Sequence, residues 1–322
     1  VRNFMQIPGS QVRAVCDMET EQLKGLASQY PQIHTTTNYD ELLDDSQVDA
    51  VAIVTPVSTH FELASRALDK GKHVLVTKPL TSNSEEAEAL IKKAEQNNLV
   101  LMVDHTYVYT GAVRRMRELI QSGELGEIYY YDSTRVNLGL FQHDVNVLWD
   151  LAVHDLSIMD YVLDQRPIGV AATGMKHVPK EPENIAYLTV FFESNLIAHI
   201  NVNWLAPVKV RQTLVGRSEK MIVYNDLEST EKIRFHDRGV SYHSDPENSY
   251  AMLISYRSGD MWAPHLDQTE ALRAEALHFV DCVENGTKPI TDGQAGMRLV
   301  RILEAADHSM AQRGQMVELY WN

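Results

Sequence analysis

The stretch HVLVTKPLTSNSEEAEAL, residues 73–90, decides how the first third of the chain folds. Its apolar beginning, 73–77, predicts a short buried strand, and the serines and glutamates near its end predict the first turn of a helix. Lys78 and Pro79 stand between these two elements. A lysine at the end of a buried strand costs free energy unless its charge has a task or a route to water.

Strands and helices alternate on both sides of this stretch. The residues predict strands at 11–16, 48–54, 73–77 and 100–103, and helices at 19–30, 58–70 and 82–97, the last capped by Ser82 or Ser84. This alternation is typical of a doubly wound parallel (Rossmann) sheet, in which ligands bind beyond the carboxyl ends of the strands. The residues at those ends are Asp17, Thr55-Pro56, Lys78-Pro79 and Asp104-His105. We therefore expect them to line one crevice.

The second half of the chain has a different pattern. Helices are predicted at 112–122, 147–163, 268–284 and 292–313, and strand-like runs at 127–135 and repeatedly between 168 and 235. Runs of strands followed by helices predict an α+β domain with a mostly antiparallel, open sheet. We expect a dinucleotide-binding domain at 1–105 and a substrate and oligomerisation domain at 106–322.

The composition indicates a cytoplasmic enzyme. The chain has 322 residues and a formal net charge of −15, which disfavours binding to nucleic acid or to an anionic membrane. Its two cysteines, Cys16 and Cys282, cannot form a disulfide framework. No signal peptide and no apolar run of membrane-spanning length is visible. We therefore expect a cytoplasmic protein that binds neither nucleic acid nor membrane; a small-molecule substrate is implied only by the family resemblance given below.

The front of the predicted sheet departs from the usual dinucleotide-binding pattern. Such domains begin with a strand, a G-x-G-x-x-G turn and a helix, and an acidic residue about 20 positions later binds the ribose. Asp17 is placed to be that acid, although it could also serve only as a helix cap. VRNFMQIPG, residues 1–9, resembles the end of the first helix. We therefore expect a first strand and glycine turn to be absent, with poor solubility or loss of NAD binding as the consequence.

A second candidate constellation lies in VLWDLAVHDLSIMDYVL, residues 147–163. Asp150 and His154 are four residues apart, so on a helix they share a face. A carboxylate one turn from an imidazole can orient it, and histidine is the side chain best suited to proton transfer near neutral pH. The pair is also compatible with a hydrogen-bonded core histidine. Metal-ligand residue types are present at His143, Asp144, His154 and Asp155, but no zinc-type spacing occurs and we expect no metal.

Lys78 and Pro79 have an alternative of their own. A lysine at a sheet end can simply extend its amine into solvent. Pro79 removes a backbone donor and fixes the local geometry, which would help to aim the lysine, but it could also only delimit the next helix.

Together these motifs resemble the glucose–fructose oxidoreductase / inositol dehydrogenase (Gfo/Idh/MocA) family. The matching motifs are T-P-x-x-x-H from Thr55 to His60, K-P at 78–79, and D-x-x-x-H at Asp150 and His154. The resemblance covers essentially the whole chain apart from the front. Segments such as STRVNLG (133–139) and NWLAPVKVR (203–211) resemble members that act on nucleotide sugars.

The resemblance implies roles for individual residues. Lys78 would contact the sugar hydroxyl, and His154 would be the acid/base at the oxidised carbon, with Asp150 holding the substrate or the histidine. Asp17 would bind the adenosine ribose, which favours NAD over NADP because a 2′-phosphate would meet a carboxylate. The cofactor groove would be lined by Thr55, Pro56, His60, Lys78 and Pro79, and the sugar and diphosphate would be bound by Arg135, Asn137, Lys209 and Arg211.

The resulting expectation is an NAD-dependent sugar dehydrogenase that forms a homodimer or homotetramer. It would transfer hydride between the nicotinamide and a sugar carbon, C3 of a nucleotide sugar. The alternatives are a free-sugar or inositol dehydrogenase and a non-catalytic dinucleotide-binding sensor. Two features depart from the family pattern: Thr77 stands where the family has glutamate before K-P, and the glycine turn is absent.

Overall fold

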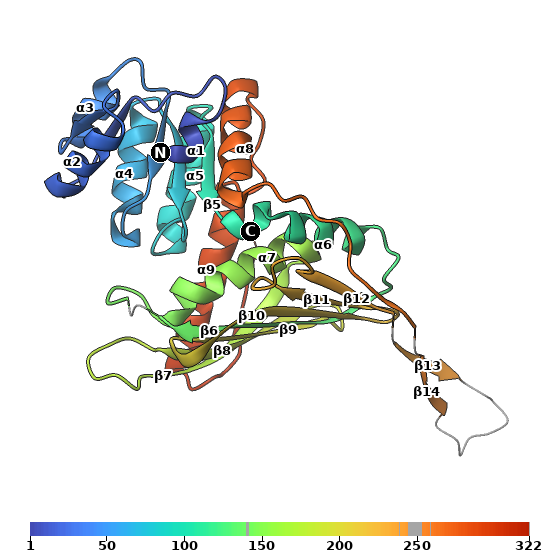
Figure 1. Cartoon of the computed structure of the whole chain (residues 1–322). Coiled ribbons are helices and arrows are strands. Elements are labelled where there is room, and N and C mark those ends of the chain that lie inside the picture. Colours follow the sequence, from blue (N-terminus) through green and yellow to red (C-terminus); the bar gives the residue numbers. More distant parts are fainter. Residues whose placement is uncertain (140–141, 238, 244–252, 258, 322) are drawn as a thin grey trace. The chain divides into compact units, whose positions relative to one another are not determined.

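The structure, a computed structural model, describes residues 1–139, 142–237, 239–243, 253–257 and 259–321. The chain forms two compact units, and each unit contains two segments of the chain (Figure 1). The first unit contains Val1–Tyr109 and Thr269–Val300, and the second contains Thr110–Gln268 and Arg301–Asn322. The chain therefore returns to the first unit near its C-terminal end before it completes the second.

The first unit is built on parallel strands, as the alternating sequence predicts. β3 (Ala50–Ile53), β4 (His73–Thr77) and β5 (Leu101–Asp104) form a parallel sheet in that order. β1 (Ala14–Cys16) and β2 (His34–Thr36) form a separate parallel pair. The three central residues of β4 are all buried, because the strand is covered on both faces, and this explains its continuous apolar run.

Helices connect these strands and complete the unit. They are α1 (Arg2–Met5), α2 (Thr20–Gln29), α3 (Tyr39–Asp44), η1 (Val57–Thr59), α4 (His60–Asp69), α5 (Ser84–Gln96), η2 (Thr106–Tyr109), α8 (Ala271–Asn285) and the first part of α9 (Gly293–Ala311). The cap of α5 differs from the expected serines. It is Asn83, whose side-chain oxygen accepts the Glu86 amide at 2.8 Å. Serine and asparagine cap helices about equally well, so the sequence alone could not choose among these neighbours.

The second unit contains one large sheet, which confirms the predicted antiparallel domain. Within the described residues its strand order is β15-β12-β11-β10-β6-β9-β8-β7-β16, and only β6 and β9 pair in parallel. The strands are β6 (Ile128–Leu138), β7 (Pro167–Met175), β8 (Ile185–Phe192), β9 (Ile197–Asn203), β10 (Leu205–Arg217), β11 (Met221–Asn225), β12 (Ile233–His236), β15 (Met261–Trp262) and β16 (Val317–Glu318). A separate hairpin is formed by β13 (Gly239–His243) and β14 (Leu253–Arg257).

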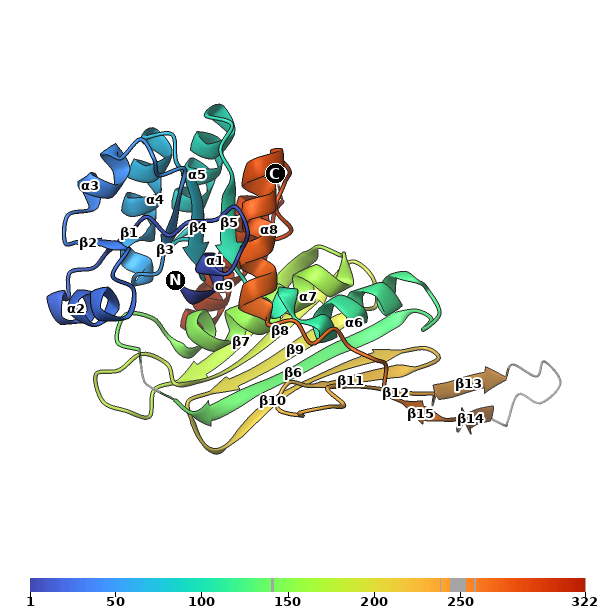
Figure 2. The same cartoon turned by 45° about the horizontal axis from the view of Figure 1, so that its top comes forward.

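Helices of the second unit cover one face of this sheet (Figure 2). They are α6 (Gly111–Gln121), α7 (Val153–Leu163) and the part of α9 from Arg301 onward, with a π-helical turn at Leu148–Ala152 directly before α7. Alternate residues of the central strands point into this core and are fully buried, for example Leu188 and Ile200. No described helix of this unit lies on the opposite face in Figures 1 and 2. There Tyr187 and Ile197 remain 46% and 45% exposed.

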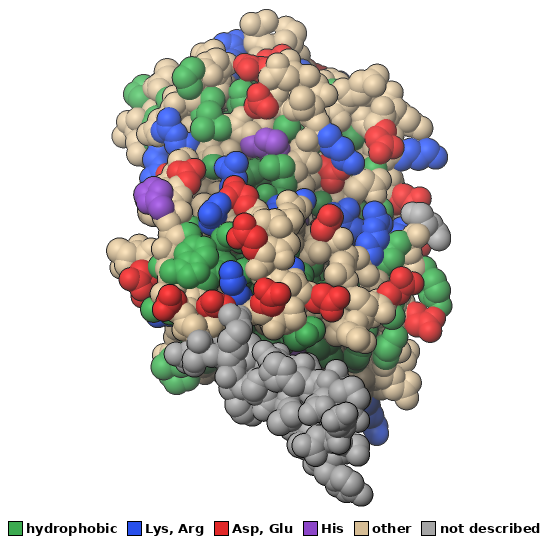
Figure 3. All heavy atoms as spheres, turned by 90° about the vertical axis from the view of Figure 1, so that its right-hand side faces the viewer, with side chains coloured by type: hydrophobic (Ala, Val, Ile, Leu, Met, Phe, Trp, Pro, Cys, Tyr) green, Lys and Arg blue, Asp and Glu red, His purple; other side chains and the backbone are tan. Residues whose placement is uncertain are grey.

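The surface reflects the acidic composition. Figure 3 shows acidic side chains spread over one face and interspersed with basic ones, without a continuous basic patch on that face. Among the described helices, none has the length and apolar character needed to cross a membrane.

Candidate active site

The carboxyl ends of the strands in the first unit carry the residues that were predicted to bind NAD. Asp17 directly follows β1, and its Oδ1 accepts a hydrogen bond from the Glu19 amide at 2.8 Å. The N-cap of α2 is Glu19, so Asp17 lies before the cap position and not at it. The contact fixes the carboxylate in the turn that leaves β1.

Two apolar residues flank these strand ends and are exposed. Met18, beside Asp17, is 90% exposed, and Val54, beside Thr55, is 75% exposed. Sequence analysis missed both, because Val54 looked like the end of a buried strand. The adenosine half of NAD needs a carboxylate for the ribose hydroxyls and apolar surface for the adenine. The end of β1 supplies such a carboxylate and an exposed apolar side chain, and the end of β3 supplies a second exposed apolar side chain.

His60 connects two of the segments that were predicted to line the cofactor groove. Its Nδ1 lies 2.9 Å from the carbonyl oxygen of Pro79, and its Nε2 lies 2.8 Å from the carbonyl oxygen of Thr55. The residue is almost completely buried. These contacts join the loop after β3 to the loop after β4, so Thr55, His60 and Pro79 form one connected group beside Lys78.

His105 is a titratable neighbour of Lys78. The sequence predicted this only from the expectation that the ends of neighbouring strands lie side by side. Lys78 follows β4, and the peptide bond between it and Pro79 is cis. His105 follows β5 and is buried. Burial lowers the pKa of His105 to about 4; the Asp104 carboxylate opposes this shift and the Lys78 ammonium adds to it. His105 is therefore neutral at physiological pH. The charge of Lys78 acts on the residue that follows β5.

A buried acid lies behind the same edge of the sheet. Glu275, from α8, approaches Asp104, and burial together with the Asp104 carboxylate raises the pKa of Glu275 to about 10. Glu275 is therefore protonated at neutral pH and can donate to Asp104. Oδ1 of Asp104 also accepts from the amide and the hydroxyl of Thr106, at 3.1 and 2.5 Å. Sequence reasoning missed Glu275 because it lies far along the chain on an ordinary amphipathic helix.

The second unit carries the predicted proton-transfer pair. The helix predicted at 147–163 is present, but its first residues form the π-helical turn before α7. Asn146 starts this turn: its Oδ1 accepts the Leu148 amide at 3.0 Å, and its Nδ2 donates to Asp307 at 2.8 Å. Asp150 lies in the π turn and His154 in the first turn of α7. Such turns are rare and occur frequently at functional sites.

Asp150 is held by a tryptophan that sequence analysis did not single out. The indole Nε1 of Trp204 donates to Oδ2 of Asp150 at 3.1 Å, and Trp204 is fully buried. A Cβ placed on Gly139 would lie 2.9 Å from Trp204 and 3.1 Å from the side-chain nitrogen of Asn137. Asn137 and Trp204 therefore both lie beside Gly139, which must be small, and Trp204 in turn binds Asp150. In the sequence, the only indication of this contact was that Trp204 lies within the motif NWLAPVKVR (203–211).

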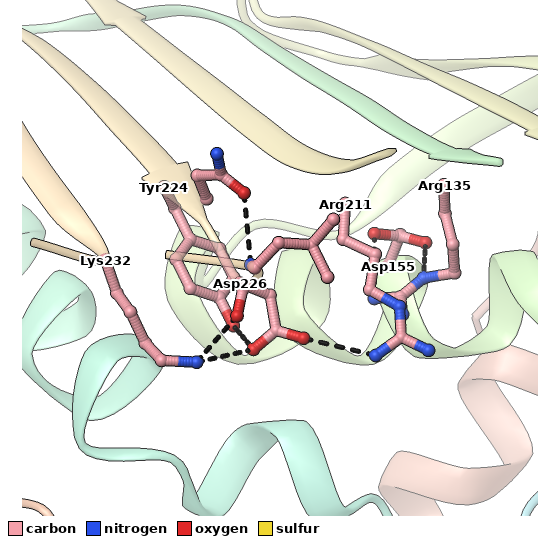
Figure 4. A network of polar contacts seen from close by, with 8 residues as sticks. Arg135, Asp155, Arg211, Tyr224, Asp226 and Lys232 are labelled. Carbon is pink, nitrogen blue, oxygen red and sulfur yellow. Dashed lines mark hydrogen bonds and ion pairs between the residues drawn. The ribbon is translucent and has the colours of Figure 1, made fainter. Parts of the chain in front are cut away.

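Arg135, predicted to contact the sugar, is buried and forms an ion pair with Asp155. Its Nε donates to Oδ2 of Asp155 at 2.6 Å, and Nη2 donates to Oδ1 at 3.3 Å (Figure 4). Both side chains are only 3% exposed. The hydroxyl of Ser133 donates to the same Oδ1 at 2.6 Å. The structure thus brings Arg135 to the residue that follows His154.

Arg211, the other predicted arginine, belongs to a second group of charges (Figure 4). Asp226 accepts from Arg211 and from Lys232, each at 3.2 Å, and from the hydroxyl of Tyr224 at 3.2 Å. Burial favours the neutral acid, but Lys232 and Arg211 outweigh it and lower the pKa of Asp226. Two cations and one carboxylate leave a net positive charge. Lys209 is exposed on the same strand, where the pairing of β10 with β6 shifts register.

The alternative metal site has no support in the part of the chain that the structure describes. No group of three or more His, Cys, Asp or Glu side chains there is placed to hold a metal ion. Two of the four considered residues have other partners: Nδ1 of His143 lies 2.9 Å from Glu181, and Asp155 binds Arg135.

A parallel α/β unit with a dinucleotide-type edge, joined to a unit with a large antiparallel sheet and a helical Asp–His pair, defines a nicotinamide-dependent oxidoreductase. Residues 1–105 match the family profile described as "Oxidoreductase family, NAD-binding Rossmann fold". Residues 113–222 match the "GFO/IDH/MocA C-terminal domain". The chain belongs to the GFO/IDH/MocA family of oxidoreductases, which confirms the expected family, the two folds and NAD as the cofactor.

Several relatives match nearly the full length. UDP-N-acetylglucosamine 3-dehydrogenase from Acidithiobacillus ferrooxidans is 28% identical over 90% of this chain and 87% of its own. The solved structure of that enzyme, GnnA, has a TM-score of 0.77 at 25% identity, covering 96% of this chain and 93% of its own. The NAD(+)-dependent scyllo-inositol 2-dehydrogenase from Bacillus subtilis is 26% identical over 91% of this chain and 84% of its own.

Proposed function

We propose that the protein is an NAD-dependent dehydrogenase that oxidises the C3 hydroxyl of a nucleotide sugar. The observation that carries the proposal is that Asp150, in the π-helical turn, precedes His154, in the first turn of α7, by four residues, with the carboxylate of Asp150 held by Trp204. A histidine with a carboxylate one turn away is well suited to move a proton near neutral pH.

The residues divide the chemistry as follows. NAD, when bound, supplies the hydride acceptor. His154 would take the proton of the hydroxyl while the C–H electron pair leaves as hydride, and a ketone results. Lys78 would hydrogen-bond the oxygen and stabilise the negative charge that develops there, and Asp150 would orient the imidazole or the sugar. Asp17 would bind the ribose, and the groove would be lined by Thr55, Pro56, His60 and Pro79.

The group of Arg211, Asp226 and Lys232 supports a nucleotide sugar as the substrate. A shared carboxylate holds the two cations in place, and preorganised cations of this kind suit a diphosphate. The similarity to UDP-N-acetylglucosamine 3-dehydrogenase points the same way. Asn137 and the exposed Lys209 are the remaining candidates for contacts with the sugar and the diphosphate.

A free-sugar or inositol dehydrogenase is the second candidate, since scyllo-inositol 2-dehydrogenase is a relative of similar identity. A non-catalytic sensor is a third. Lys78, Asp150 and His154 favour an enzyme over the sensor, because binding a dinucleotide alone does not need an acid/base pair. We also propose a cytoplasmic homodimer or homotetramer, in which the open face of the large sheet is covered by a second copy.

A substrate panel tests the function. UDP-N-acetylglucosamine, N-acetylglucosamine and scyllo-inositol are each incubated with NAD, and reduced nicotinamide is followed by absorbance. We expect turnover of the nucleotide sugar, loss of that turnover in His154→Asn, and at least a tenfold higher KM for it in Arg211→Met. Lys176→Met, which removes an exposed positive charge elsewhere in the second unit, is the control. Preference for scyllo-inositol would establish the second candidate, and NAD binding without turnover would support the sensor.

A further inference from the structure

Three consecutive inward-facing residues of β6 hydrogen-bond to a single residue of α7. They are Tyr131, Ser133 and Arg135, which alternate along the strand and therefore lie on one face. Ser133 and Arg135 bind the carboxylate of Asp155, and the hydroxyl of Tyr131 donates to the Asp155 carbonyl oxygen at 3.1 Å. Asp155 is the residue directly after His154.

We propose that Tyr131, Ser133 and Arg135 are positioning residues that act through Asp155 to set the direction of the His154 imidazole. The proposal rests on the proposed acid/base role of His154. On a helix, fixing one residue at both its side chain and its carbonyl fixes the rotation of the helix about its axis, and thereby the direction of the residue before it.

The contacts are of the kind that resists displacement. Arg135 binds Asp155 through two nitrogens, and such two-point pairs define an orientation as well as a distance. All four side chains are buried, so water does not compete for the hydrogen bonds. Burial and the nearby Asp155 carboxylate raise the pKa of Tyr131 well above its usual value, so its hydroxyl remains a donor.

The backbone on the other side of His154 supports the same conclusion. The hydroxyl of Ser157 donates to the His154 carbonyl oxygen at 2.7 Å, one turn ahead. One turn behind lies the π-helical segment, whose hydrogen bonds are spaced differently from those of α7. Because α7 starts on this irregular turn, no regular α-helical segment precedes it. The rotation of α7 about its own axis is therefore not fixed from that side. The contacts to β6 supply that constraint where α7 begins.

A polar cluster of this kind is not required for packing alone. A buried ion pair can often be replaced by apolar residues of similar size without loss of stability. The double variant Arg135→Met/Asp155→Leu therefore separates stability from positioning. Tyr131→Phe is a milder change that removes one hydroxyl. Val162→Ala is the matched control, because Val162 is fully buried on the same helix, two turns away from His154.

Two measurements on the full chain test the proposal. Nitrogen-15 NMR of histidine-labelled protein, with the His154 signal assigned from His154→Asn, reports the environment of the imidazole without any substrate. Steady-state kinetics with UDP-N-acetylglucosamine and NAD report kcat and KM separately. We expect the double variant to melt near the wild-type temperature, to shift the His154 signal and to lower kcat at least tenfold with KM nearly unchanged. Tyr131→Phe should do the same to a smaller degree, and Val162→Ala should lower only the melting temperature.

The outcomes distinguish this inference from the proposed function. If His154→Asn abolishes turnover but the double variant keeps the wild-type kcat and His154 signal, the positioning role is wrong. The same holds if Val162→Ala lowers kcat as much as the double variant does at equal loss of stability. If the wild type turns over no sugar in the panel while the His154 signal still shifts only in the β6 and Asp155 variants, the positioning stands and the proposed function fails.

Discussion

Nδ1 of His60 lies 2.9 Å from the carbonyl oxygen of Pro79, so a side chain at the start of α4 holds the backbone directly after Lys78. The opposite ring nitrogen contacts the Thr55 carbonyl oxygen, which ties the same imidazole to the end of β3. A residue first noticed as part of a T-P-x-x-x-H motif therefore has a mechanical role. It holds two loops in a fixed relation within the first unit.

Replacing His60 by leucine should destabilise the protein and weaken NAD binding. Leucine leaves the carbonyl oxygen of the buried Pro79 without this partner, and a buried unpaired group costs about 1–3 kcal/mol. We expect the free energy of unfolding in urea to fall by about 2 kcal/mol or more and the Kd for NAD to rise. His34→Leu, at an exposed position on β2, is the control and should change neither quantity. Unaltered NAD affinity in His60→Leu would show that the two loops are held by other contacts.

Lys78→Met should leave the fold intact and lower turnover by about two or more orders of magnitude, the usual scale for a positioned group in proton transfer. Methionine has a similar length and keeps the apolar stem but removes the charge. Steady-state kinetics on the best substrate of the panel measure the effect, and circular dichroism verifies the fold. Lys70→Met, which removes an exposed lysine that pairs with Asp44, is the control and should leave turnover unchanged. Near-normal turnover in Lys78→Met would defeat the assignment.

Glu275 makes the stability depend on pH in a defined direction. Its carboxyl has a pKa of about 10 in the folded chain against an ordinary value of 4.5, so between these limits the folded state keeps a proton that the unfolded state releases. Stability from this group is therefore present at low pH and is lost as pH rises, by at most about 1.4 kcal/mol per pH unit. The pKa of His105 is lowered from 6.5 to about 4, so its opposite effect is confined to pH values below about 6.5.

The variant Glu275→Gln isolates this dependence. Glutamine keeps a donor for Asp104 and cannot ionise, so its stability relative to the wild type should grow between pH 7 and pH 9. Urea unfolding at several pH values measures the difference. Glu284→Gln, at an exposed position on α8, should show no such trend. A constant difference across this range would mean that Glu275 is ionised in the folded state.

The open face of the large sheet should mediate self-association. Tyr187 and Ile197 are exposed there on adjacent strands, and Tyr187 stacks on His199 with ring centroids 6.3 Å apart. We expect Tyr187→Glu/Ile197→Glu to lower the mass found by light scattering to that of a single chain, because two charges cannot be buried unpaired in an interface. Tyr320→Glu, at an exposed position near the C-terminus, is the control. A wild-type chain that is monomeric at micromolar concentration would contradict the proposal.

The sequence predicts the elements well where its pattern is local. β4 has the bounds expected from its apolar run, and α5 and α6 differ from prediction by one or two residues at their ends. The exception is the start of the helix at 147–163, which is a π turn, because nothing in LWDLA distinguishes it from an α-helix. The register of β6 with β9 and β10 joins distant segments and could not be derived from one sequence.

The candidate site shows the same division. Asp17, Thr55 and Lys78 could be predicted at the ligand-binding edge, because each follows a strand and the topology of a parallel sheet fixes where the carboxyl ends lie. Partners that come from elsewhere in the chain were not predictable. The contact of Trp204 with Asp150 and the approach of Glu275 to Asp104 both depend on tertiary packing. Arg135 was noted as a cation but not as the partner of Asp155, since no local pattern links residues on a strand and a later helix.

Val300 and Arg301 are consecutive residues of α9, yet they belong to different compact units. The chain changes unit three times, after Tyr109, after Gln268 and within this helix. A recombination event with one crossover after Tyr109 would give the first unit a foreign α8 and a foreign beginning of α9. Exchange of the second unit between relatives, in evolution or in the laboratory, must therefore insert Thr110–Gln268 between two segments of the first unit and also match Arg301–Asn322, which belongs to the same second unit.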